Sequence, residues 1–194
     1  MFLINKFNPT NIYTYFLLLA YIFTIFYIKE TLFIFYNSTD SPDFFRYFKY
    51  LEFNVNIVEN TSSEQGFLFY DLHSLYFYFR NFTIAEQNFF IFLSKSIQEL
   101  NLIFFLTGCF GLYKLFKVYK YTNIQILSAL IFINLTPIAI AQRIVFKPEV
   151  MIFALLPWLI LSYELFCKSK KIIYLLCSIP IFSGLMLQKG SSIA

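Results

Sequence analysis

Residues 100–118 read LNLIFFLTGCFGLYKLFKV and contain no charged residue before Lys114. A helical run of about 20 apolar residues matches the ~30 Å hydrocarbon core of a bilayer. The apolar positions are continuous rather than alternating, which favours a helix over a barrel strand. We therefore expect this stretch to cross a membrane.

Outward from this stretch, four more segments share the pattern. They cover about Asn11–Tyr36 (interrupted by Lys29 and Glu30), Ile124–Ala141 (with Pro137 near its far end), Val150–Cys167, and Ile172–Leu187 (with Pro180 inside). The first is long and no small-residue cleavage site follows it, which favours a retained anchor over a signal peptide.

The composition agrees, because 59% of the residues are hydrophobic and only 13% are charged, against roughly 25% charged residues in soluble domains. We predict an all-α integral membrane protein with about five transmembrane helices, forming a single membrane domain over residues 1–194. No run of like charges indicates nucleic-acid binding. Cys109, Cys167 and Cys177 lie in apolar segments and have neither disulfide nor metal spacing.

The distribution of lysine predicts the orientation of the chain. Alternate connections hold Lys6, then Lys114, Lys117 and Lys120, then Lys168, Lys170 and Lys171. The long segment 37–99, the turn with Arg143 and Lys147, and the end near Lys189 fall on the other side. We expect a multi-pass protein of the plasma or inner membrane with a cytoplasmic N-terminus and segment 37–99 outside.

Three stretches of the outer segment combine aromatic and charged residues at helical spacing. They are residues 41–53, 64–79 and 85–99, the last leading into the second span. Helices of this kind lie in the membrane interface. We predict that two or three of them cover the outer ends of the spans.

Two carboxylates, Asp40 and Asp43, come shortly after the first span. A carboxylate at the membrane surface can act as a general base toward an acceptor hydroxyl. On spacing alone, the alternative that both are solvated loop acids has more weight.

Cations on the predicted outer side are candidate phosphate ligands. Arg143 and Lys147, with Glu149, lie in the sequence RIVFKPEV, and Lys189 follows the fifth span. Arginine binds phosphate through a bidentate fork, whereas snorkelling at a helix end is the simpler alternative.

The only histidine, His73, lies two residues after Asp71. A lone histidine cannot form a multi-histidine metal site, and we interpret His73 as a polar interfacial residue. No metal ligands are assigned, and the need for a divalent metal stays open.

The sequence P-D-x-x-R-Y after the first span, here Pro42, Asp43, Arg46 and Tyr47, resembles the opening of GT-C glycosyltransferases. Residues 66–78 and the turn at residues 146–149 are similar to later segments of that family, although a lysine-proline-proline motif expected before residue 66 is missing. The subgroup meant contains mannosyl-, aminoarabinosyl- and galacturonosyltransferase-like proteins.

The resemblance implies transfer of a sugar from a polyprenyl-phosphate donor to a lipid or glycan acceptor on the outer face. Asp43 would be the essential acid, with Asp40 second, and Arg46 and Tyr47 of the motif would contact substrate. The predicted topology, rather than the resemblance, adds Arg143, Lys147, Glu149 and Lys189 as substrate-binding candidates, because it puts them on the same outer side. Family members have more spans, so we expect an N-terminal portion of such an enzyme. The alternatives are a transporter or flippase component and a small membrane subunit that handles lipid-linked substrate.

Overall fold

The computed structural model describes residues 9–32, 67–79, 89–144 and 149–187, and every element in these ranges is an α-helix. The helices are α1 (Pro9–Leu32), α4 (Phe67–Phe79), α5 (Phe89–Val118), α6 (Asn123–Leu135), α7 (Pro137–Ile144), α8 (Glu149–Ser169) and α9 (Ile172–Met186). The predicted all-α class is confirmed for this part of the chain.

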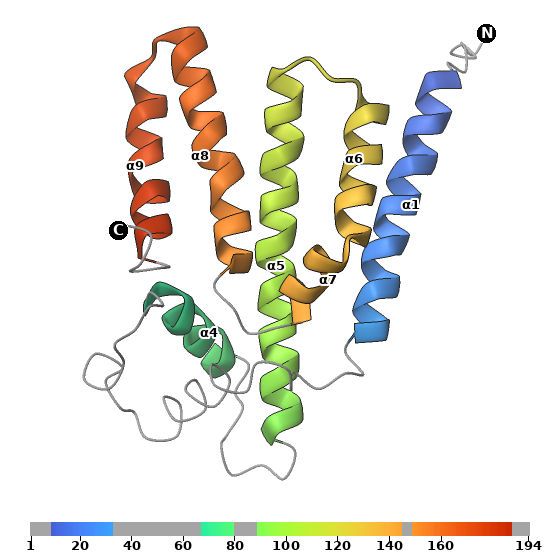
Figure 1. Ribbon diagram of the computed structural model, residues 1–194, viewed down its shortest axis with the longest axis vertical. Coiled ribbons are helices and arrows are strands. Elements are labelled where there is room, and N and C mark those ends of the chain that lie inside the picture. The colour runs from blue at the N-terminus through green and yellow to red at the C-terminus, as the bar shows by residue number, and fades with distance from the viewer. Residues whose placement is uncertain (1–8, 33–66, 80–88, 145–148, 188–194) are drawn as a thin grey trace, which may run out of the picture.

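The long helices stand side by side, and their directions follow the predicted alternation (Figure 1). Helices α1, α6 and α9 run down in this view, whereas α5 and α8 run up. The turns α5–α6 and α8–α9 lie at one end of the bundle, which we call the lysine end because they hold Lys120, Lys170 and Lys171. Helices α4 and α7 and the start of α8 lie toward the other end, the polar end.

The closest packing joins α5 to α8 through two glycines. A Cβ atom on Gly108 would lie 2.5 Å from the Phe153 carbonyl oxygen, and one on Gly111 would lie 2.9 Å from Nε1 of Trp158. Small residues let helix backbones approach closely, as in many membrane helix pairs. The Trp158 indole also donates a hydrogen bond to the Thr107 carbonyl at 3.0 Å. The α5–α8 pair is therefore the rigid centre of the bundle.

The third predicted span is divided into α6 and α7. Thr122 and Gln125 form a capping box at the start of α6, which satisfies two backbone N–H groups. At the other end Thr136 has an extended backbone (φ −68°, ψ 141°), the conformation favoured for a residue before proline. Pro137 then opens α7. We call this interruption the α6–α7 break.

The second predicted span differs from expectation at its start. Residues 85–99 were predicted to be an amphipathic stretch that leads into this span, and residues 89–99 are the first three turns of α5. Residues 89–107 contain no glycine or proline, so no helix-breaking residue ends the helix at the predicted boundary. The predicted helix over residues 64–79 is confirmed as α4, and residues 41–53 lie outside the described residues.

Much of the outer surface of the described helices is apolar. On α1, Tyr15, Phe16, Leu19 and Phe23 are each at least 65% exposed. Two helices are long and apolar enough to cross a membrane, Ser94–Val118 and Glu149–Ser169, and three shorter apolar helices accompany them. An exposed apolar surface of this extent is typical of a lipid-facing or partner-facing protein.

Candidate functional site

The polar end of the bundle contains a buried cluster of polar side chains built around Arg143. This arginine lies in the last turn of α7 and is 4% exposed. Its Nε donates to the Ala139 carbonyl at 3.2 Å, and its Nη2 donates to the Asn134 carbonyl at 2.9 Å. The guanidinium carbon lies 4.8 Å from the centroid of the Phe105 ring.

These contacts explain why a charged side chain is buried at this place. A helix end leaves its last carbonyl groups without intrahelical donors, and Pro137 has no N–H to offer. Arg143 reaches back across the α6–α7 break and donates to a carbonyl in the last turn of α6. The sequence placed Arg143 in a turn at the surface, but it is buried in a helix and stabilises the break from inside.

Asn101 connects this cluster to α4. It is fully buried in α5, and its Nδ2 donates to the Arg143 carbonyl at 3.5 Å. Its Oδ1 lies 3.2 Å from Nε2 of His73, whose Nδ1 lies 3.0 Å from the Phe69 carbonyl. A second link between α4 and α5 is the Tyr76 hydroxyl, which donates to the Glu99 carboxylate at 3.0 Å. Helix α4 is thus fastened to the polar end by side-chain hydrogen bonds.

His73, which we interpreted as a polar interfacial residue, is 1% exposed and packs against α5. Burial lowers its pKa to about 4, and this outweighs the carbonyl groups that favour the protonated ring. The ring is therefore neutral at pH 7 and carries one N–H. The face of α4 that holds His73 and Phe69 packs inward. The centroid of the imidazole lies 4.3 Å from that of the Phe69 ring and 5.9 Å from that of the Phe104 ring.

Asn134 connects the cluster to α1. It is fully buried near the end of α6, and its Nδ2 donates to Oγ1 of Thr24 at 2.7 Å. Its Oδ1 is buried with no hydrogen-bond partner among the described residues. Through Asn134, Arg143 and Asn101, five helices (α1, α4, α5, α6 and α7) meet in one polar cluster at this end.

Only some of the site residues predicted from the sequence lie in the part of the chain that the structure describes. Asp40, Asp43, Arg46, Tyr47, Lys147 and Lys189 lie outside the described residues. Glu149 is the first residue of α8, where the positive end of the helix dipole favours a carboxylate. Of the predicted substrate-binding residues, the structure thus describes Arg143 and Glu149, one at the end of α7 and the other at the start of α8.

Sequence reasoning missed Asn101 and Thr24, through which α5 and α1 join this cluster. A polar residue inside an apolar span is a signal for a buried contact, and Asn101 carries that signal at the start of residues 100–118. Its partner His73 is 28 positions away, so the contact could not be read from spacing. Within the described ranges, no group of His, Cys, Asp and Glu is arranged to hold a metal ion.

In comparisons with known proteins, no protein-family model, curated protein or solved structure matches the chain.

Proposed function

We propose that the chain is a polytopic membrane protein in which α1, α5, the pair α6–α7, α8 and α9 cross the bilayer. Two long apolar helices and three shorter ones support this arrangement, as does the exposed apolar surface of α1 and α9. The lysine-rich turns at one end would face the cytoplasm. The polar end would then face outward.

We propose further that the protein transfers a sugar from a polyprenyl phosphate to an acceptor at the polar end. One observation carries this proposal. Helix α1 ends toward the polar end (Figure 1), and the segment with Asp43 follows it. Arg143 and Glu149 belong to that same end, and α4 lies beside α5 there. The similarity of Pro42, Asp43, Arg46 and Tyr47 to the GT-C motif then assigns the chemistry.

In this mechanism Asp43 accepts the proton of an acceptor hydroxyl, with Asp40 as the second candidate. The hydroxyl oxygen attacks the anomeric carbon of the sugar, and the bond from that carbon to the phosphate oxygen breaks. Its electron pair leaves with the polyprenyl phosphate. Cations stabilise the charge that develops on this phosphate in the transition state.

The contacts of Arg143 indicate that it has a structural role, which leaves phosphate binding to the lysines. Two of its donor nitrogens are used by backbone carbonyls of α6 and α7. Arg143 therefore positions the α6–α7 break, while Lys147 and Lys189 are the candidates for direct phosphate contact. In the sequence, Lys147 is the third residue after the end of α7.

The test is a membrane assay with polyprenyl-phosphate hexose as the donor. Asp43→Asn should lower transfer at least a hundredfold, since general base catalysis contributes about 10²–10⁴-fold. The matched control is Asp71→Asn, because Asp71 is an exposed acid on α4. Unchanged transfer in Asp43→Asn, or an equal loss in Asp71→Asn, contradicts the assigned role.

One observation favours a second candidate, a transporter or flippase component. Transporters often use interrupted helices whose polar groups bind substrate within the membrane. The α6–α7 break carries the buried oxygen Oδ1 of Asn134 without a described partner. Purified protein in vesicles separates the two candidates, because a flippase moves the lipid-linked sugar across the bilayer without transferring it.

A further inference from the structure

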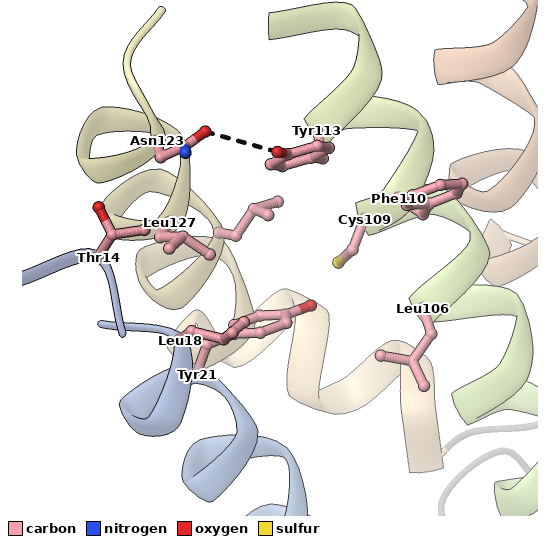
Figure 2. A pocket seen from close by; sticks show the side chains of 10 residues that line it. Thr14, Leu18, Tyr21, Leu106, Cys109, Phe110, Tyr113, Asn123 and Leu127 are labelled. Carbon is pink, nitrogen blue, oxygen red and sulfur yellow. Dashed lines mark hydrogen bonds between the residues drawn. The ribbon is translucent and has the colours of Figure 1, made fainter. Parts of the chain in front are cut away.

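A second site lies near the lysine end, in a groove of about 360 Å³ between α1, α5 and α6. Ligand sites usually measure about 300–1,000 Å³. Figure 2 shows its walls, with α1, α5 and α6 each contributing side chains. The side chains of Arg143, Asn134, Asn101 and His73 do not line this groove. Its inner end borders their cluster, because Oγ1 of Thr24 donates to the Tyr21 carbonyl at 2.7 Å.

Each helix lines the groove with a stripe at helical spacing. Helix α1 contributes Thr14, Leu18 and Tyr21, and helix α6 contributes Asn123, Leu127 and Leu130. Both stripes follow the spacing i, i+4, i+7, which keeps side chains on one face. In both, the residue nearest the lysine end is polar and the next one is leucine.

The stripe of α5 runs the opposite way and completes the same pattern. It holds Leu106, Cys109, Phe110 and Tyr113, with Tyr113 nearest the lysine end. The Tyr113 hydroxyl donates to Oδ1 of Asn123 at 3.5 Å, as the dashed line in Figure 2 marks. The groove thus has a polar mouth, formed by Thr14, Tyr113 and Asn123, above an apolar interior.

Two ammonium groups lie over aromatic rings of this groove. Nζ of Lys117 is 5.8 Å from the ring centroid of Tyr113, and Nζ of Lys114 is 5.2 Å from that of Phe110. Both lysines are exposed. The stretches that build the groove, residues 14–21 and 106–130, contain no aspartate or glutamate. The mouth is therefore cationic, with no acid from its own segments to neutralise it.

We propose that this groove binds one acyl chain of an anionic phospholipid, with the phosphate at Lys114, Lys117 and the Tyr113–Asn123 mouth. The chain then packs against Leu18, Leu106 and Leu127. Charge complementarity selects the lipid, because basic residues attract anionic headgroups at the membrane surface. The proposal rests on the membrane placement of the bundle and not on sugar transfer.

Retention of lipid by the purified full-length protein tests the headgroup contact. The protein is reconstituted in vesicles of equal phosphatidylglycerol and phosphatidylcholine, extracted in mild detergent, and its bound lipids are counted by native mass spectrometry. We expect one retained phosphatidylglycerol, with a preference that falls roughly tenfold or more in the double variant Lys114→Gln, Lys117→Gln. The matched control is Lys170→Gln, Lys171→Gln, which removes two lysines from the neighbouring turn. Equal retention of both lipids by the wild type, or an equal loss in the control, overturns the proposal.

Filling the groove tests the chain contact. Leu106→Trp places a large ring on the groove wall at a residue that is 36% exposed, and Ile160→Trp makes the same change on α8 at 40% exposure. The first should reduce retained lipid to background and the second should leave it unchanged. Leu18→Trp on the opposite wall repeats the test if circular dichroism shows that Leu106→Trp is misfolded. Unchanged retention in a folded groove variant contradicts the site, and so does conversion of a dimer to a monomer, which would identify a second copy as the occupant.

No sugar donor is present in this experiment. Loss of transferase activity with intact lipid retention therefore refutes the proposed function alone, and loss of lipid retention with intact transfer refutes only the groove.

Discussion

The two ends of the bundle treat polar groups in opposite ways. At the polar end, Arg143, Asn101 and His73 are buried and bonded to partners on other helices. At the lysine end the polar groups stay exposed, as in the hydrogen bond of 2.8 Å from the Tyr119 hydroxyl to the Glu164 carboxylate. Burial makes the loss of one partner costly, whereas exposed contacts exchange with water. The comparison teaches that polar side chains determine structure where they are buried, at the polar end, and are replaceable where they are exposed, at the lysine end.

The largest expected effect comes from Arg143→Ala. It removes the donors to the Asn134 and Ala139 carbonyls and the contact with Phe105. Hydrogen bonds from a charged group contribute about 1.5–3 kcal/mol each, so we expect the free energy of unfolding to fall by about 4 kcal/mol. Denaturant unfolding in micelles, followed by circular dichroism, measures it. At the lysine end, Lys168→Ala removes a bond of 2.9 Å to the Val118 carbonyl and serves as the control, because exposed contacts of lysine contribute about 1 kcal/mol or less. Equal losses of unfolding free energy in the two variants would contradict the proposed difference between the two ends.

The second effect is a pH dependence at the polar end. The pKa of His73 is about 4 in the folded chain, against 6.5 for an ordinary histidine. Between these values the unfolded chain binds a proton that the folded chain does not, so stability falls as the pH drops from 6.5 toward 4. The full loss is about 3 kcal/mol. About 2 kcal/mol of this loss falls between pH 7 and pH 5, and unfolding at these two values measures it, with His73→Gln expected to flatten the profile. If His73→Gln does not change how the free energy of unfolding depends on pH, groups other than His73 cause that dependence.

A smaller and stabilising effect is expected at the lysine end. Lys120 follows α5 with a φ of 64°, a left-handed conformation that glycine adopts without cost. Lys120→Gly should raise the free energy of unfolding by about 1 kcal/mol. Lys120→Asn separates the backbone effect from the loss of charge, because asparagine tolerates this conformation too. Destabilisation by both variants would mean that the lysine side chain, not the backbone, determines stability there.

The smallest effect belongs to Tyr119→Phe. Its hydrogen bond to Glu164 raises the pKa of Tyr119, but both partners lie at the exposed lysine end. We expect a change below about 0.5 kcal/mol in the same unfolding measurement, in the range of exposed polar contacts. Tyr76→Phe, which removes the bond to Glu99 at the polar end, should cost more. A reversed order of these two variants would contradict the comparison.

Much of the fold follows from local sequence features. Continuous apolar runs predicted α1, α8 and α9 to within a few residues at most ends, and lysine spacing predicted which turns share an end of the bundle. The α6–α7 break is encoded by Thr136 and Pro137, whose local conformations follow from proline. We nevertheless predicted one continuous span over residues 124–141, because a membrane helix can also contain a proline near its end without being interrupted.

The candidate site was less accessible to sequence reasoning. Arg143 was recognised as important, but its partners are backbone carbonyls on either side of a break, which no motif records. The contact between His73 and Asn101 depends on how α4 docks against α5, and that docking is a tertiary event. Asp43 was assigned through a family resemblance, and its segment lies outside the described residues.

The most direct test of the account is the sidedness of the two ends. In a background with all three cysteines replaced, Asp43→Cys, Lys147→Cys and Lys170→Cys are exposed in intact cells to a maleimide that cannot cross the membrane. The account predicts labelling at positions 43 and 147 without permeabilisation, and at position 170 only after it. Labelling of positions 43 and 147 from opposite sides would contradict the account.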